Sequence, residues 1–185
     1  SGMTNLVCAG FGGQGVLTAG LIIAKTGMDI GKNVVWIPSY GSEMRGGTAN
    51  CNVKISEEEI ASPFIRSIDV LLALNEPSVD KFQGSIAPGG TMIINSSIVK
   101  REQFRPDIHV YAVEATGLAA ELENSRGANI VMIGAFSKTT GVIGETQMEE
   151  GIENFFLSKG KCNPKNRECF AAGIRSVREL QRAVV

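Results

Sequence analysis

An apolar run leads directly into a cluster of glycines in the stretch Met3-Thr4-Asn5-Leu6-Val7-Cys8-Ala9-Gly10-Phe11-Gly12-Gly13-Gln14-Gly15. Its first part, residues 3–9, predicts a strand, and residues 14–30 repeat apolar side chains at helical spacing until Gly31, a common helix terminator. A second apolar run at residues 33–38 predicts another buried strand. Strand, glycine turn, helix and strand within about 35 residues form a βαβ unit, which predicts a parallel sheet.

The rest of the chain continues with strands and helices. Apolar and polar residues alternate over residues 50–55, which predicts a half-buried strand with one polar face. Buried strands are predicted at 68–74, 91–95 and 108–113, with a turn at 88–90, and helices at 77–82, 115–123, 129–140, 146–157 and 164–183. We therefore expect a single α/β domain over residues 3–185, with a Rossmann-like open, mostly parallel sheet flanked by helices and a helical C-terminal part.

The composition is that of a folded, soluble domain. The chain has 185 residues, of which 43% are hydrophobic and 20% charged, and these values exclude intrinsic disorder. Lysine and arginine number 18 against 19 aspartate and glutamate residues, so the net charge of −1 gives no indication of binding to nucleic acid or to an anionic membrane. No apolar run approaches the roughly 20 residues that a membrane-spanning helix requires.

The cysteines and the N-terminus indicate a cytoplasmic protein. No secretory signal is recognisable, and the two residues before Met3 are expected to be a remnant of cloning. Four cysteines are present, at Cys8, Cys51, Cys162 and Cys169, and we expect them to be reduced. Six residues separate the last two, a spacing that fits neither zinc nor iron–sulfur sites, so no metal site is expected on this chain.

The glycine cluster matches the pattern Gly10-x-Gly12-x-x-Gly15 between a strand and a helix. Glycines allow a ligand to approach the backbone closely, and the free N–H groups at a helix start favour an anion. The alternative is that these glycines only form a tight turn. A dinucleotide-binding fold also needs an acidic residue near the end of the second strand, and the sequence there, Val35-Trp36-Ile37-Pro38-Ser39, has none. The pattern therefore disfavours a nicotinamide cofactor.

A second loop, residues 39–48, is expected at the same carboxyl edge of the sheet, where ligands of open α/β sheets bind. Arg45 lies beside two glycines, so its guanidinium could present a planar fork of donors to a phosphate or carboxylate. The alternative is an ion pair between Glu43 and Arg45 within the loop. His109, the single histidine, lies in a predicted strand and is expected to be structural. No Ser/His/Asp or Cys/His set is evident, so we expect no catalytic residue on this chain.

The two loops together resemble the gamma subunit, or gamma domain, of 2-oxoacid:ferredoxin oxidoreductases. The resemblance lies in Gly10-Phe11-Gly12-Gly13-Gln14-Gly15 and in the stretch from Pro38 to Gly47, and it extends over essentially the whole chain. It implies a role in thiamine-diphosphate-dependent oxidative decarboxylation of a 2-oxoacid to acyl-CoA, carbon dioxide and reduced ferredoxin. In that family alpha, beta and delta subunits carry the thiamine diphosphate and the iron–sulfur clusters.

The resemblance also implies which residues contact coenzyme A or a partner subunit. They are Gly10, Gly12, Gly13, Gln14 and Gly15 in the first loop, and Tyr40, Gly41, Glu43, Arg45, Gly46 and Gly47 in the second. The second loop is more similar to gamma subunits of 2-oxoglutarate and branched-chain enzymes than to those of pyruvate enzymes, which favours 2-oxoglutarate as the substrate. Two other hypotheses remain at this point: a free-standing nucleotide-binding module or dehydrogenase domain, and a scaffold protein whose glycines are purely structural.

Overall fold

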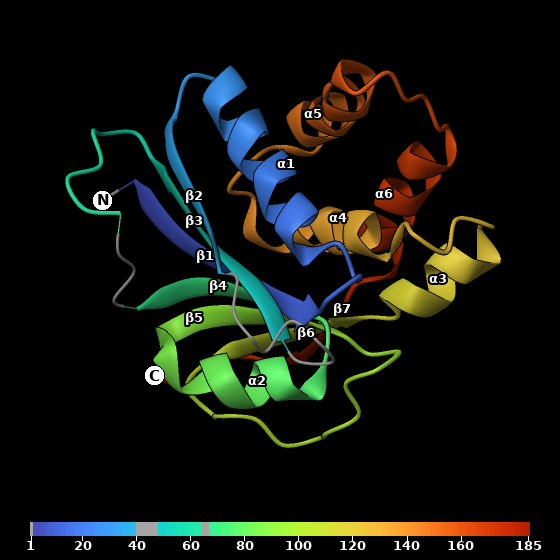
Figure 1. The fold of residues 1–185 in the computed structure, drawn as a ribbon. Helices are drawn as coiled ribbons and strands as arrows, with labels where there is room; N and C mark the ends of the chain where they lie inside the picture. The colour runs from blue at the N-terminus through green and yellow to red at the C-terminus, as the bar shows by residue number, and fades with distance from the viewer. Residues whose placement is uncertain (1, 40–47, 64–66) are drawn as a thin grey trace.

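The computed structural model describes residues 2–39, 48–63 and 67–185. A sheet of seven strands in the order β2-β3-β1-β4-β5-β6-β7 runs through the centre (Figure 1). The strands are β1 Met3–Phe11, β2 Asn33–Ser39, β3 Thr48–Ser56, β4 Ile68–Ala73, β5 Ile86–Asn95, β6 His109–Val113 and β7 Arg178–Gln181. β1, β4, β5 and β6 pair in parallel, whereas β3 is antiparallel to both of its neighbours and β7 is antiparallel to β6. The expected Rossmann-like α/β architecture is confirmed, in the form of a mixed sheet.

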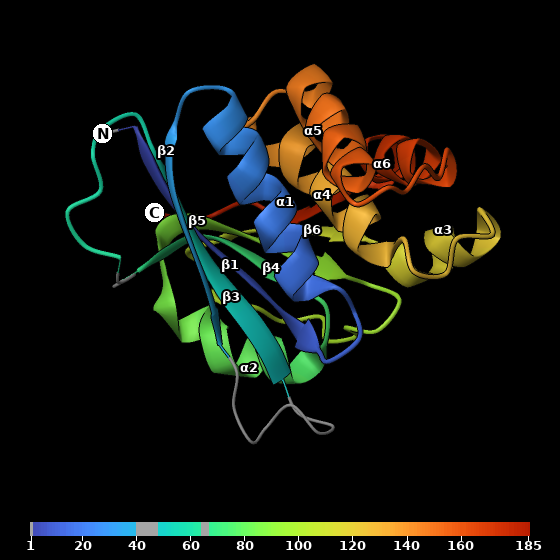
Figure 2. The ribbon, with the colours of Figure 1, turned by 45° about the horizontal axis from the view of Figure 1, so that its top comes forward.

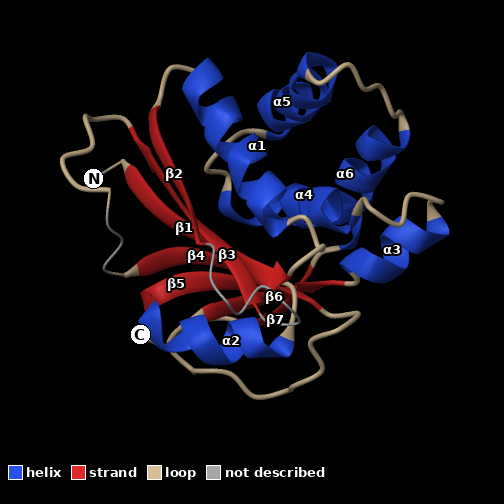
Figure 3. Cartoon of the chain, viewed as in Figure 1, coloured by secondary structure: helices blue, strands red, loops and turns tan. Residues whose placement is uncertain are grey.

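Helices cover both faces of this sheet, as Figures 1 and 3 show. The helices α1 Val16–Asp29, α4 Ala128–Thr140, α5 Glu145–Ser158 and α6 Lys165–Ser176 lie on one face, and α2 Glu76–Phe82 lies on the other. The short helix α3 Ala115–Glu121 lies beyond the sheet, beside the start of α4 (Figure 2). Two apolar cores result, a large one under α1 and α4 that includes Leu6 and Cys8, and a smaller one under α2 that includes Val7 and Ala9. This alternation along β1 is what a strand buried on both faces requires.

The first βαβ unit differs from the expected arrangement in one respect. β1 and β2 run in the same direction and are joined by α1, but β3 lies between them and pairs with both. β2 is therefore an edge strand, and its side chains from Val34 to Pro38 are only partly buried, contrary to the prediction of a buried strand. The apolar run is explained by one face alone, on which Val34 and Trp36 pack against the core under α1.

Three further expectations are wrong in detail. The predicted helix 164–183 ends at Ser176, because Val177 has an extended backbone and the chain continues as β7. The predicted turn at 88–90 lies inside β5, where Gly89 supplies a positive φ of 83°. On the polar face of β3, Asn50 and Lys54 are buried rather than exposed, and Lys54 Nζ donates a hydrogen bond of 2.6 Å to the Ser62 carbonyl oxygen.

Helices α4 and α6 approach each other closely through two glycines. A Cβ added at Gly134 would overlap the carbonyl oxygen of Phe170, and one added at Gly173 would overlap the carbonyl oxygen of Val131. The two backbones are therefore in direct contact, which a larger residue at either position would prevent. This contact fixes α6, and the segment that precedes it, against α4.

We expect Gly134→Ala to lower the free energy of unfolding by at least about 2 kcal/mol, because the added methyl overpacks the contact between the helices. Gly84→Ala is the matched control, since a Cβ at Gly84 would meet no atom within 4 Å. Urea denaturation of both variants measures the difference. Equal stability of the two variants would show that α4 and α6 can separate without cost.

Candidate functional site

The glycine loop connects β1 to α1 and uses two residues with positive φ. Gly13 has φ 91° and Gly15 has φ 74°, values that residues with a side chain rarely adopt. Gly15 is also the N-terminal cap of α1 and has no side chain to accept hydrogen bonds from the first turn. The N–H groups of that turn have no partner within the helix, so the start of α1 carries partial positive charge.

The side chain of Gln14 links the glycine loop to the end of β4. Its side-chain Oε1 accepts a hydrogen bond of 2.6 Å from the backbone N of Phe11, and its Nε2 donates one of 3.3 Å to the carbonyl oxygen of Leu74, at the end of β4. A Cβ on Gly10 would lie 2.5 Å from Gln14 Oε1 and would displace this side chain from its position. Gly10 and Gln14 therefore hold the loop in shape between β1 and β4.

Asn129, in the first turn of α4, holds the other side of the loop. Its Nδ2 donates a hydrogen bond of 3.1 Å to the carbonyl oxygen of Gly15, and a Cβ on Gly15 would lie 2.5 Å from that nitrogen. Asn129 is 6% exposed and lies on a helix whose neighbouring residues are mostly apolar. An asparagine within such an apolar stretch indicates a functional position. The sequence prediction assigned no function to Asn129.

A pocket of about 540 Å³ opens beside the glycine loop, and we call it the glycine-loop pocket. It lies where the start of α1, the segment between α3 and α4, and the segment between α5 and α6 meet. The described residues that line it are Gly13, Gly15, Thr18, Asn124, Arg126, Asn129, Ile130, Phe156, Lys161, Asn163 and Asn166.

The charged side chains among the described lining residues of this pocket are all positive. Arg126 and Lys161 are exposed, and neither has an ion pair within the described part of the chain. No aspartate or glutamate is among the described lining residues. Two cations and the positive end of α1 therefore converge on one hollow, an arrangement that attracts a polyanion.

Three asparagines connect the segments that form the pocket wall. Asn124 Nδ2 donates to Asn166 Oδ1 at 3.1 Å, and Asn163 Nδ2 donates to Asn124 Oδ1 at 3.5 Å. Asn124 Nδ2 also lies 3.5 Å from Cys169 Sγ. Burial raises the pKa of the Cys169 thiol, so this cysteine is a neutral packing group.

The other two buried cysteines lie beneath the start of α1. Cys8 and Cys51 face each other across the β1–β3 pair, and both are fully buried. The hydrogen bond with Cys51, together with burial, raises the pKa of the Cys8 thiol. The Cys51 thiol lies 3.5 Å from the carbonyl oxygen of Val16. These residues behave as the small hydrophobic groups that the sequence predicted.

A smaller hollow of about 260 Å³ also adjoins the glycine loop. Phe11, Gly12, Gly13 and Ala49 are among the residues that line it. Phe11 pairs with Thr48 at the start of β3, so this hollow adjoins the position where β2 ends and β3 begins. Gly13, Gly15 and Thr18 line both this hollow and the glycine-loop pocket.

The predicted site residues of the first loop thus fall into three groups. Gly13 and Gly15 line both hollows, Gly12 lines only the smaller one, and Gly10 and Gln14 support the loop. The residues Tyr40, Gly41, Glu43, Arg45, Gly46 and Gly47 lie outside the described residues. Arg126 and Lys161, which the sequence gave no reason to connect, lie in separate loops and come together only in the folded chain.

Other candidate sites are few in the described part of the chain. His109 Nδ1 accepts a hydrogen bond of 3.1 Å from the backbone N of Ala183, a structural contact that ties the C-terminal segment to β6. Residues 2–39, 48–63 and 67–185 contain no group of three or more His, Cys, Asp or Glu side chains that could hold a metal ion. The same ranges contain no helix long and apolar enough to span a membrane.

These features define an α/β domain with a glycine loop at the carboxyl edge of a mixed sheet. The chain belongs to the pyruvate ferredoxin/flavodoxin oxidoreductase family, whose model matches residues 5–176. Ketoisovalerate oxidoreductase subunit VorA of Methanothermobacter thermautotrophicus is 38% identical over 92% of this chain, which spans 36% of the length of that relative. The 2-oxoglutarate synthase subunit KorC of Methanocaldococcus jannaschii is 33% identical over 93% of this chain and 92% of its own.

Solved structures agree with the family assignment. The gamma subunit of a keto/oxoacid ferredoxin oxidoreductase from Geobacter sulfurreducens superposes with a TM-score of 0.80 at 27% identity, covering 95% of this chain and 97% of that one. A chain of the 2-oxoglutarate:ferredoxin oxidoreductase from Magnetococcus marinus, solved with 2-oxoglutarate, coenzyme A and succinyl-CoA bound, gives a TM-score of 0.83 at 24% identity. The match covers 94% of this chain and 30% of the Magnetococcus chain, and it shows a shared fold.

We expect Gly15→Ala to cost about 1–2 kcal/mol more in the free energy of unfolding than Gly31→Ala. Both glycines have positive φ, so both variants carry similar backbone strain, but only a Cβ on Gly15 would displace the Asn129 amide and break its partly buried hydrogen bond. Urea denaturation compares the two variants directly. Equal losses would mean that Asn129 is not required to hold the loop.

Proposed function

We propose that this chain is the gamma subunit of a 2-oxoacid:ferredoxin oxidoreductase and that its glycine-loop pocket binds the phosphate groups of coenzyme A. The observation that carries the proposal is the convergence of Arg126, Lys161 and the start of α1 on a hollow whose described lining has no carboxylate. Coenzyme A has a diphosphate and a 3′-phosphate, and it is the polyanion among the substrates of these enzymes. Guanidinium, ammonium and backbone N–H donors suit phosphate oxygens.

Two comparisons support this assignment. The chain belongs to the oxidoreductase family, and the Magnetococcus enzyme of the same fold was solved with coenzyme A bound. The shape of the loop adds a physical argument, because Gly13 has open space around its Cα and leaves the backbone accessible to a ligand. In the proposed complex this chain binds and orients coenzyme A.

The chemistry of the complex is the oxidative decarboxylation of a 2-oxoacid. The bond between the carboxylate and the carbonyl carbon breaks and releases carbon dioxide, the acyl group is transferred to the thiol of coenzyme A, and two electrons pass to ferredoxin. We propose that alpha, beta and delta subunits hold the thiamine diphosphate and the iron–sulfur clusters. We also propose a cytoplasmic location, supported by four cysteines that are all free thiols.

We propose 2-oxoglutarate as the substrate, on the resemblance of residues 40–48 to the corresponding loop of 2-oxoglutarate and branched-chain enzymes. The relatives named above act on ketoisovalerate and on 2-oxoglutarate, which supports an oxoacid of this range. A panel of 2-oxoacids assayed with the purified complex tests the choice. A higher kcat/KM for pyruvate than for 2-oxoglutarate would contradict it.

The alternative of a dinucleotide-binding module is disfavoured by the strand order. In such folds the second strand lies next to the first, and an acidic residue at its end binds the ribose. Here β3 occupies the place beside β1 and runs in the opposite direction, and its first residues Thr48 and Ala49 adjoin the glycine loop. Micromolar binding of NAD(H) in a calorimetric titration would revive this alternative.

We expect Arg126→Gln to weaken the binding of coenzyme A roughly 10- to 150-fold, because a charged hydrogen bond is worth about 1.5–3 kcal/mol. Lys161→Gln should have an effect of the same kind. Arg178→Gln on β7 is the matched control, because Arg178 is exposed and does not line the pocket. Isothermal titration calorimetry measures the three dissociation constants. A loss in the Arg178 variant equal to that in the Arg126 variant would indicate a nonspecific effect of charge.

Mild affinity purification of this chain from its own cells should recover larger subunits that bind thiamine diphosphate and iron–sulfur clusters. Mass spectrometry identifies the copurified proteins, and an unrelated tagged protein of similar size serves as the control. Recovery of the chain alone, folded and stable, would contradict a role as a subunit and favour the free-standing nucleotide-binding module.

A further inference from the structure

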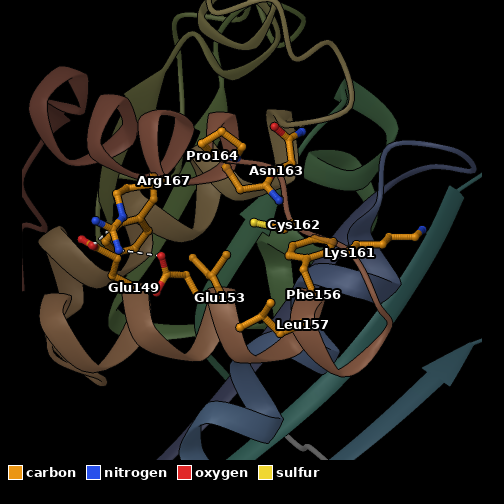
Figure 4. Close-up of a pocket in the computed structure, with 12 residues that line it drawn as sticks. Glu149, Glu153, Phe156, Leu157, Lys161, Cys162, Asn163, Pro164 and Arg167 are labelled. Carbon is orange, nitrogen blue, oxygen red and sulfur yellow. Dashed lines mark hydrogen bonds and ion pairs between the residues drawn. The ribbon is translucent and has the colours of Figure 1, made fainter.

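A second cavity, of about 370 Å³, lies between α5 and α6, and we call it the α5–α6 cleft (Figure 4). Ile152, Phe156 and Leu157 of α5 and Phe170 of α6 supply its apolar surface. Leu157 is 59% exposed, so an apolar surface is open to solvent here. The cleft has no role in the function proposed above.

The cleft adjoins the glycine-loop pocket. Both cavities are lined by Phe156, Lys161, Asn163 and Asn166, which therefore stand at their junction. Figure 4 shows Lys161 and Phe156 side by side at one end of the cleft and Arg167 at the other. A ligand whose phosphates occupied the glycine-loop pocket would extend past Lys161 into the cleft.

The two cavities differ in charge. The glycine-loop pocket has cations without carboxylates among its described lining, whereas the cleft is lined by two carboxylates and two cations. These are Glu149, Glu153, Arg167 and the shared Lys161. Both carboxylates are paired with this arginine, at 3.1 Å from Nε to Glu149 and at 2.5 Å from the guanidinium to Glu153. The cleft is thus electrically balanced and suits an uncharged group, while the phosphates are favoured on the other side of Lys161.

The cleft also offers flat surfaces. The ring of Phe156 packs edge-to-face against Phe155, with centroids 5.3 Å apart and planes at 87°. This contact stabilises the orientation of the Phe156 ring. The guanidinium of Arg167 is held by its two carboxylates. Aromatic rings and guanidinium planes are the groups on which nucleobases stack. The amides of Asn163 and Asn166 at the junction can donate to and accept from the edge of a base.

From these features we infer that the α5–α6 cleft binds the adenine ring of coenzyme A, with Phe156 as its stacking surface. The inference rests on the proposed function and deepens it, because it assigns the uncharged end of the nucleotide to a cavity separate from that of the phosphates. The chain thereby recognises the nucleotide at both ends, with Lys161 between them.

Calorimetric titration of the full chain with adenosine 3′,5′-bisphosphate and with inorganic diphosphate tests the inference. Phe156→Leu should weaken the bisphosphate roughly tenfold, which is about 1.4 kcal/mol, and change diphosphate affinity by less than twofold. Phe156→Tyr should restore binding, since it retains the ring. Phe104→Leu is the matched control, because Phe104 is also partly buried but packs in the core on the opposite face of the sheet.

The reactivity of Cys162 gives an independent measurement. Cys162 lines the cleft but not the glycine-loop pocket, and it is exposed while the other three cysteines are buried. Adenosine 3′,5′-bisphosphate at saturation should slow the alkylation of Cys162 by iodoacetamide at least fivefold, and inorganic diphosphate should not.

Three results would overturn the inference. Binding of coenzyme A with unchanged affinity in Phe156→Leu would place the base elsewhere and leave the proposed function intact. Protection of Cys162 by 4′-phosphopantetheine but not by the bisphosphate would assign the cleft to the other arm of coenzyme A. Failure of the folded wild-type chain and of the assembled complex to bind coenzyme A would refute the proposed function, and the inference with it.

Discussion

The hydrogen bond from Asn129 Nδ2 to the Gly15 carbonyl oxygen joins two parts of the chain that are 114 residues apart. On one side of it lie β1, the glycine loop and α1, and on the other lies α4, against which α6 packs through direct backbone contact. Together with the packing of α1 against α4 and α5 in the main core, this contact positions the segments that carry Arg126 and Lys161 relative to the start of α1. Because Gly15 has positive φ and no Cβ, the amide can approach closely, and the pocket results from that approach.

Because β3 lies between β1 and β2, the surroundings of the glycine loop differ from those in a dinucleotide-binding fold. A strand that runs antiparallel to β1 brings its first residues, not its last, to the glycine loop. No side chain at the end of a neighbouring parallel strand is then available for a ribose on that side. In the proposed function coenzyme A is bound at the glycine-loop pocket, to which the helical C-terminal part supplies amides and cations.

Local patterns were sufficient to predict β1, the glycine turn, α1 and the central parallel strands, because periodicity and glycine position are properties of short segments. Strand order was not predictable, since the pairing of β3 with both β1 and β2 depends on contacts distant in sequence. The predicted helix 164–183 includes β7, because the four residues of this strand have no pattern of their own and are ordered by pairing with β6. The cations of the pocket come from separate loops, so no motif could reveal them.

Amide hydrogen exchange of the chain with and without coenzyme A tests whether the glycine-loop pocket binds coenzyme A, because it reports on every segment at once. We expect slower exchange at saturating coenzyme A in the glycine loop and the first turn of α1, residues 12–18, and in residues 124–130 that face them. Exchange in β7 should not change. Unaltered exchange in residues 12–18, or protection confined to segments that do not line the glycine-loop pocket, would contradict binding of coenzyme A at this pocket.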